Sequence, residues 1–155
     1  MQIIGEVTAR LLERGTGRVV REATRRNVIT DTGLALAVGR MIHYEPQRIS
    51  YVAIGTGSTA AATADESLET EVARTEINTY SDSGAVATIG AFFTSAECTY
   101  LIREIGVFGG SAWSGQQPSA TLDSGQLFSR TVVNLDNSAG NYDLSVEWSY
   151  TFARE

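Results

Sequence analysis

The feature that most constrains the fold is the alternation of apolar and polar side chains in residues 142–152, which read YDLSVEWSYTF. The apolar set is Leu144, Val146, Trp148, Tyr150 and Phe152. The polar set is Asp143, Ser145, Glu147, Ser149 and Thr151. Successive side chains of a strand point to opposite faces, so one set is expected in a core and the other in water. The segment therefore predicts a strand of an antiparallel sheet with one solvated face.

Strand-like segments make up most of the chain from residue 49 onward. They lie at residues 49–55, 71–80, 85–94, 99–110 and 125–135, and a long loop of small residues separates the first two. A chain of 155 residues with 43% hydrophobic content can form one domain with its own core. Strands joined by turns, without helices between them, predict a mainly β fold of the antiparallel β-sandwich class.

One short helix is expected in the N-terminal half of the chain, near residues 31–43. Residues 30–32, Thr-Asp-Thr, offer an N-terminal cap, and Pro46 ends the helical region by residue 45. Apolar residues at helical spacing on one face are Leu34, Val38, Met41 and Ile42. The pattern predicts a helix with one apolar stripe.

The first 29 residues predict a protruding β-hairpin. Residues 2–13 and 18–29 are two extended segments around Arg14-Gly15-Thr16-Gly17, and the second mixes β-branched residues with arginines. We therefore expect residues 1–29 to form an extended β-hairpin arm and residues 30–155 to form the β-sandwich domain with the helix.

Charge is distributed unevenly between these two parts. The net charge is −6, and the twelve basic residues are all arginines. Residues 1–26 carry six arginines and three acids, whereas residues 27–155 carry six arginines and fifteen acids. Arginine forms bidentate, weakly hydrated ion pairs, so the hairpin is a candidate contact surface. Its candidate partner-binding residues are Arg14, Arg18, Arg21, Arg25 and Arg26. A solvated hairpin face is the alternative interpretation.

Residues 55–60, GTGSTA, follow a strand and have the spacing of a dinucleotide-binding turn. That turn must open a helix, but the following residues STAAATADES show no apolar helical stripe. A Walker-type phosphate loop requires a lysine, and the chain has none. We interpret the turn as a structural bend in which Gly55 and Gly57 take a positive φ or approach a neighbouring backbone.

The sequence offers little for catalysis, metal binding or membrane insertion. It has a single histidine, His43, and a single cysteine, Cys98, so neither a multi-cysteine metal site nor a disulfide within the chain is expected. The acidic pairs Asp65 and Glu66, and Glu69 and Glu71, lack the ligand spacing of a calcium loop and are interpreted as solvated faces. We expect no enzyme activity, no cofactor, no metal and no membrane contact. Nucleic acid is also not expected, because the net charge is negative.

Trp113 stands in the polar loop GGSAWSGQQPSA, residues 109–120. A large aromatic side chain in such a loop can anchor a protein partner or stack on a sugar ring. It can equally fold back over the end of the sandwich. We therefore add Trp113 to the candidate partner-binding residues.

Four segments resemble, in this order, a group of structural proteins of tailed-bacteriophage virions that are associated with tails and tail fibres. Residues 27–34 follow the pattern N-x-V/I-T-D/N-x-G-L, and residues 52–58 follow I/V-A-I/V-G-T-G-S/T. Residues 68–74 follow L-x-x-E-V-x-R, and residues 102–108 follow I-x-E-I/A-G-L/V/I-F. The resemblance covers roughly residues 25–152, and it assigns the glycine turn a structural role.

The resemblance implies a non-enzymatic building block of a phage particle, in a tail, baseplate or fibre. Its partners would be copies of itself and other virion proteins, and its location would be the virion, after synthesis and assembly in the cytoplasm of the host bacterium. A capsid decoration protein that clamps capsomers is the structural alternative. A receptor-binding tail tip is the second alternative, with a host-surface glycan as the ligand.

Overall fold

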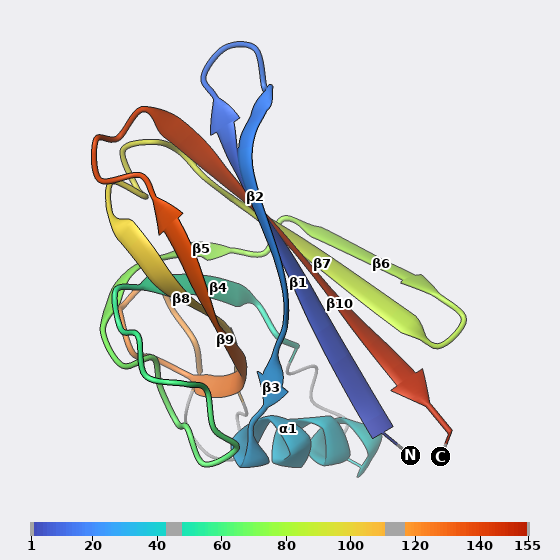
Figure 1. The fold of residues 1–155 in the computed structure, drawn as a ribbon. Helices are drawn as coiled ribbons and strands as arrows, with labels where there is room; N and C mark the ends of the chain where they lie inside the picture. Colours follow the sequence, from blue (N-terminus) through green and yellow to red (C-terminus); the bar gives the residue numbers. More distant parts are fainter. Residues whose placement is uncertain (1, 43–47, 111–116, 155) are drawn as a thin grey trace.

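A computed structural model describes residues 2–42, 48–110 and 117–154. These described residues form two five-stranded antiparallel sheets that face each other, with one helix across one end of the sandwich (Figure 1). The expected mainly β sandwich with a single helix is confirmed. The first sheet has the order β2-β1-β10-β7-β6, and the second has the order β3-β9-β8-β4-β5. The elements are β1 (Gln2–Glu13), β2 (Val19–Arg26), β3 (Val28–Ile29), α1 (Asp31–Ile42), β4 (Tyr51–Gly55), β5 (Glu71–Glu76), β6 (Thr79–Ser83), β7 (Val86–Phe93), β8 (Leu101–Gly109), β9 (Gln126–Asp136) and β10 (Tyr142–Ala153).

The core lies between the two sheets. Strand β10 shows the expected alternation: Leu144, Val146, Trp148 and Tyr150 are buried. Phe152 departs from it and is 38% exposed, because it lies at the end of the strand beside α1. The Phe128 ring meets Tyr150 edge-on, with 5.1 Å between the ring centroids. The alternating pattern therefore identified the core face of this strand except at its last apolar residue.

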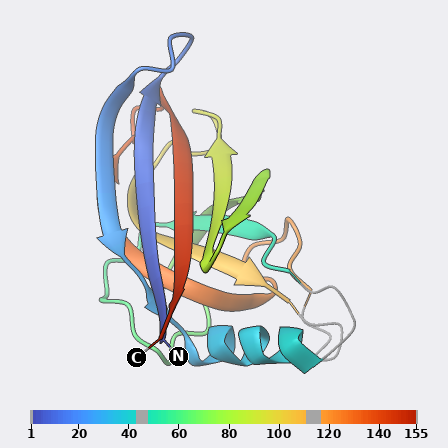
Figure 2. The same ribbon diagram turned by 90° about the vertical axis from the view of Figure 1, so that its right-hand side faces the viewer.

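The N-terminal hairpin is present, and its turn extends beyond the sandwich at the end opposite to α1 (Figures 1 and 2). Strand β1, however, pairs with β10 from Gln2 to Glu13. Its side chains Val7, Ala9 and Leu11 are fully buried in the core. The hairpin is therefore continuous with the first sheet: Ala23 of the edge strand β2 also belongs to the core, and only the turn stands away from it.

Helix α1 begins where the sequence predicted. Thr30 accepts a hydrogen bond from the Gly33 N–H at its Oγ1, at 2.9 Å, and so caps the helix. The helix turns a face of small residues to strand β9: a side chain at Gly33 would collide with the backbone of Phe128. Leu34, Val38 and Met41 are exposed instead. Three residues of the stripe seen in the sequence, Leu34, Val38 and Met41, thus point to solvent, while Gly33 allows the helix backbone to approach the sheet closely.

The segment read as one strand at residues 71–80 is divided between the two sheets. Strand β5 belongs to the second sheet and β6 to the first. The Ile77 N–H donates to Ser50 O, whereas the next residue, Asn78, donates to Gly90 O of the first sheet. The chain therefore crosses between the sheets at this point, and the buried side chain of Ile77 closes the core there.

Candidate functional site

The outer face of the second sheet carries a buried carboxylate. Glu104 lies on β8 and is 0% exposed. Its Oε1 accepts hydrogen bonds from the N–H groups of Gly57 at 3.0 Å and Thr70 at 2.8 Å. Its Oε2 accepts from the Glu69 N–H at 2.9 Å and from Arg130 Nε at 2.9 Å. The carboxylate therefore has four donors and holds the loop at residues 56–70 against the sheet.

Arg130, on the neighbouring strand β9, completes this buried network and is 2% exposed. Its Nη1 donates to Asp65 Oδ2 at 2.8 Å, and its Nη2 donates to Thr59 O at 3.0 Å. Burial lowers the pKa of the Arg130 guanidinium, but the hydrogen bonds and charges of Asp65 and Glu104 outweigh it and raise the pKa above its ordinary value. Arg130 is thus held charged and joins the loop to two strands.

This network explains the glycine turn at residues 55–60. A Cβ at Gly57 would lie 2.6 Å from Glu104 Oε1, and a Cβ at Gly55 would lie 2.5 Å from Thr70 O. Neither glycine is among those with positive φ, so the expectation of a close approach holds and that of a left-handed backbone does not. The Gly57 N–H, which would face a phosphate in a nucleotide-binding turn, donates to the protein's own carboxylate. The turn is structural in this fold.

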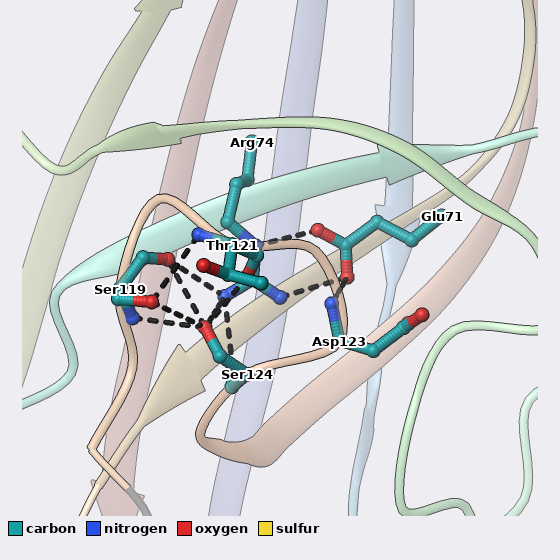
Figure 3. A network of polar contacts seen from close by, with 6 residues as sticks. All are labelled: Glu71, Arg74, Ser119, Thr121, Asp123 and Ser124. Atoms are coloured by element: carbon teal, nitrogen blue, oxygen red, sulfur yellow. Dashed lines mark hydrogen bonds and ion pairs between the residues drawn. The ribbon is translucent and has the colours of Figure 1, made fainter.

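A second polar cluster fixes the loop that precedes β9 (Figure 3). Arg74, on β5, forms a bidentate pair with Glu71 at 2.5 and 2.7 Å, and both side chains are fully buried. Its remaining nitrogen donates to Ser119 O at 3.2 Å and to Ser124 O at 2.9 Å. Its guanidinium lies over the Phe108 ring, 4.6 Å from the centroid. Arg74 therefore ties the loop to the sheet through charge and stacking together.

Three of the four resemblance motifs meet in these two clusters. The glycine turn surrounds Glu104, the acid of the motif at residues 102–108, and Glu71 and Arg74 are the paired residues of the motif at residues 68–74. Sequence reasoning did not select Glu104, Arg74 or Arg130. The available signal was an acid or an arginine inside an otherwise apolar strand, as in LIREIGVF and QLFSRTVV.

Three of the four acidic residues interpreted as solvated faces have structural partners, and Glu66 is exposed. Asp65 pairs with Arg130, and Glu71 pairs with the buried Arg74. Glu69 accepts from the Thr59 N–H at 2.8 Å, and this hydrogen bond holds the pKa of the Glu69 carboxyl below its usual value. Among residues 2–42, 48–110 and 117–154, no group of three or more His, Cys, Asp or Glu side chains is arranged to hold a metal ion.

The hairpin arginines do not form one basic surface. Arg26 lies opposite Glu6 in the register, on the face of the sheet away from the core. Arg21 and Arg25 lie opposite Leu11 and Val7, whose side chains are in the core, so they flank the open side of the sandwich. All the predicted arginines are exposed, namely Arg14, Arg18, Arg21, Arg25 and Arg26. Arg18 is paired with Glu13 at 3.1 Å beside the turn.

The two arginines on the core-facing side lie on an edge strand. Strand β2 ends the first sheet, so one side of its backbone is paired with no strand in the described chain, although Thr131 of β9 donates to Arg26 O at 3.0 Å. Charged residues on an edge strand discourage pairing between molecules, and they also attract an acidic partner. Arg21 is near enough to Asp136 of β9 to favour the charged form of that carboxylate, whose pKa is lowered mainly by the hydrogen bonds of Ser138. Arg21 and Arg25 are therefore the members of the predicted set that lie on the core-facing side of the edge strand.

The remaining candidates from the sequence are buried or lie outside the described residues. Cys98 is fully buried, and its thiol donates to Thr94 O at 3.2 Å. Burial raises the pKa of this thiol to about 11, which suits an inert core residue. Trp113 and His43 lie outside the described residues. No helix in the part of the chain that the structure describes is long and apolar enough to cross a membrane.

An apolar groove of about 580 Å³ runs between α1 and the nearby ends of the strands. One side is formed by residues of α1, among them Leu34, Val38 and Met41. The other side includes Ile3 of β1 and Phe152 of β10. Its charged lining residues in the described chain are Arg40 and Arg48. Helix α1, which forms one side of this groove, lies at the end of the sandwich opposite to the hairpin turn (Figure 2).

Comparison with protein-family models, with curated proteins and with solved structures finds no match to this chain.

Proposed function

We propose that this chain is a non-enzymatic structural component of a bacteriophage virion, associated with the tail, the baseplate or a fibre. In this role it assembles through contacts with copies of itself and with other virion proteins. The observation that carries the proposal is the use of the motif residues: Glu104, Glu71 and Arg74 hold two surface loops onto one sheet. Motifs whose residues stabilise the fold are consistent with a structural protein.

The charge pattern supports assembly through the edge of the first sheet. Arg21 and Arg25 lie on the edge strand β2, whereas residues 27–155 carry an excess of nine acidic charges. A basic edge on an otherwise acidic subunit attracts the acidic surface of a neighbour and fixes its orientation. Such a contact is heterologous, and it gives rings or stacks when it is repeated.

A capsid decoration protein would use the same sandwich and the same basic edge, so location separates the two structural roles. The test is to purify intact phage particles from a culture that produces this chain and to detect it by mass spectrometry and by an antibody. Localisation of the chain by electron microscopy to the tail, baseplate or fibre supports the proposal. Density on the capsid shell supports decoration instead. Absence of the chain from purified particles overturns both.

A further inference from the structure

The turn of the N-terminal hairpin is a narrow basic tip at the end of the molecule opposite to α1 (Figures 1 and 2). Gly15 and Gly17 lie in this turn with positive φ, and a Cβ at either position would meet no other atom within 4 Å. Arg18 beside the turn is paired with Glu13. Arg14 is exposed, and no residue of the described chain forms a hydrogen bond or an ion pair with its side chain. The tip therefore presents a free guanidinium.

A polar cavity of about 700 Å³ lies at the other end of the molecule, where Thr32 of the first turn of α1 lines it. The loop at residues 56–70 contributes Glu66 to its wall, and the loop before β9 contributes Asp123. The buried clusters fix both loops, because Arg130 donates to Asp65, next to Glu66, and Arg74 donates to the Ser124 carbonyl, next to Asp123. The walls of the cavity are therefore held in place before any partner binds.

The free polar groups of this cavity are hydrogen-bond acceptors. The carboxylates of Glu66 and Asp123 have no hydrogen bond or ion pair with any residue that the structure describes, although the Asp123 N–H donates to Glu71 at 3.0 Å. Oε1 of Gln126, another lining residue, is buried and likewise lacks a donor within the described ranges. These groups match a ligand that carries positive charge and only donates. A guanidinium is such a group, with five N–H donors and no acceptor.

The basic tip and the acidic cavity are complementary, but they lie at opposite ends of one molecule and cannot meet within it (Figure 1). They can meet between two molecules, and a contact between unlike ends is heterologous and can repeat. Pockets of about 300–1,000 Å³ enclose whole small ligands, so a cavity of about 700 Å³ has room for an arginine side chain. The chain has no lysine, so arginine is its only permanently charged basic side chain.

We propose that the hairpin tip of one copy docks in the polar cavity beside α1 of the next copy, where Arg14 pairs with Glu66 and Asp123. This inference deepens the proposed function, on which it rests for a setting in which copies of the chain assemble. It adds a contact between the two ends of the molecule to the contact proposed for the edge strand β2. The clusters around Arg130 and Arg74 then also position the walls of a docking site.

The first experiment is sedimentation velocity of the purified full chain from about 1 to 200 μM, a range that brackets a micromolar contact. The wild type should change from monomers to dimers and longer assemblies, and about 1 M salt should weaken them because it screens the charges. Arg14→Glu should raise the dissociation constant at least tenfold. Arg103→Glu is the matched control, since it makes the same charge change at an exposed position of β8. It should associate as the wild type does.

The cavity is tested by Glu66→Gln with Asp123→Asn, which should weaken association as much as the change at the tip. Both positions are exposed, and asparagine tolerates the φ of 59° at residue 123, so the fold is expected to persist. Circular dichroism and thermal melting check this for each variant. Glu6→Gln with Glu147→Gln is the control, because it removes the same charge at exposed positions of the first sheet.

Mixing the two kinds of variant tests the direction of the contact. Arg14→Glu retains an intact cavity, and the variant with Glu66→Gln and Asp123→Asn retains an intact tip. An equimolar mixture can therefore form one contact, and it should give heterodimers that do not grow longer. Heterodimers support head-to-tail docking, whereas a mixture that stays monomeric overturns it. Normal association of Arg14→Glu alone also overturns it.

The contact and the proposed function fail in different ways. A wild-type chain that stays monomeric at 200 μM, about the upper limit of the series, but is found in purified particles overturns docking between copies and leaves the proposed function standing. If Arg14→Glu is then lost from particles, the tip docks on a different virion protein. Conversely, the expected association of a chain that is absent from particles supports the contact and removes the virion assignment.

Discussion

Arg130 donates from Nε to Glu104 Oε2 at 2.9 Å across two neighbouring strands, and both side chains are almost completely buried. A buried pair of this kind is stable only when the remaining donors and acceptors are also satisfied. Glu104 meets this condition through three backbone N–H groups, and Arg130 through Asp65 and Thr59. The Glu104–Arg130 pair therefore holds the loop at residues 56–70 on the outer face of the second sheet. The stability of the fold is expected to depend on both partners.

Replacing Glu104 by Gln is expected to destabilise the fold by about 3–5 kcal/mol, since it leaves the Arg130 charge incompletely compensated in the interior. The amide nitrogen of glutamine also cannot accept from the N–H groups that meet there. The measurement is urea unfolding at neutral pH, with the free energy extrapolated to water. Glu147→Gln is the matched control, because Glu147 is exposed on β10. Equal stability of the two variants would contradict the role given to Glu104.

Gly57→Ala should destabilise the protein by about 1–3 kcal/mol, because overpacking forces atoms apart. The added methyl would lie 2.6 Å from Glu104 Oε1, and the carboxylate cannot retreat without losing its backbone donors. Ser58→Ala, at the next and exposed position, serves as the control and should change stability little. Thermal unfolding of the three proteins provides the comparison, and an unchanged Tm for Gly57→Ala would show that the turn has room.

Nucleotides are not expected to bind at the glycine turn. The Gly57 N–H is already bonded to Glu104, so a phosphate would have to displace a buried carboxylate. Adding ATP or NAD at about 1 mM should therefore leave the Tm unchanged, whereas a ligand at 100 times its Kd would add about 2.7 kcal/mol of stability. A rise in Tm for the wild type that disappears in Gly57→Ala would restore the nucleotide interpretation.

The sequence predicted the β-sandwich because the alternation of apolar and polar side chains along a strand can be seen from the order of neighbouring residues. It predicted a helix near residues 31–43, against the observed Asp31–Ile42, because the cap is local, with Gly33 bonded to Thr30. It predicted the apolar stripe of α1 but not the surroundings of that stripe, since periodicity shows a face but not what the face meets. The buried clusters were missed for a related reason. Glu104, Gly57 and Arg130 are far apart in the chain, and only the fold brings the glycine turn over the carboxylate.

The stability of the protein is expected to fall in alkaline solution because of Cys98. Burial raises the pKa of its thiol to about 11, above the ordinary value of 9.0. A group whose pKa is raised on folding stabilises the folded state below its unfolded pKa, and the contribution is lost as the pH rises from about 9 to about 11. The loss is about 3 kcal/mol, at 1.36 kcal/mol for each pKa unit.

The measurement is urea unfolding of the wild type and of Cys98→Ala at pH 8 and at pH 11. Cys98→Ala is less stable at pH 8, because it leaves a cavity, but it should lose less stability between the two values. All other titratable groups are common to the two proteins, so their effect cancels in the comparison. At pH 8 the native thiol should also resist a thiol reagent until the protein is unfolded. Rapid labelling of the native protein would contradict a buried, protonated Cys98.

The basic edge is tested by removing Arg21 and Arg25 together. In the proposed assembly these two arginines meet the acidic surface of a neighbour, so the double substitution to Ser should reduce incorporation into particles at least tenfold. Arg103→Ser with Arg154→Ser makes the same change in net charge at exposed positions outside the edge strand β2, and it should incorporate normally. Light scattering of the purified variants distinguishes a second role. If Arg21 and Arg25 only protect the edge strand, their loss causes aggregation of the free protein, whereas the loss of a docking contact leaves it soluble. A soluble double variant that enters particles as well as the control would remove the contact role from the hairpin.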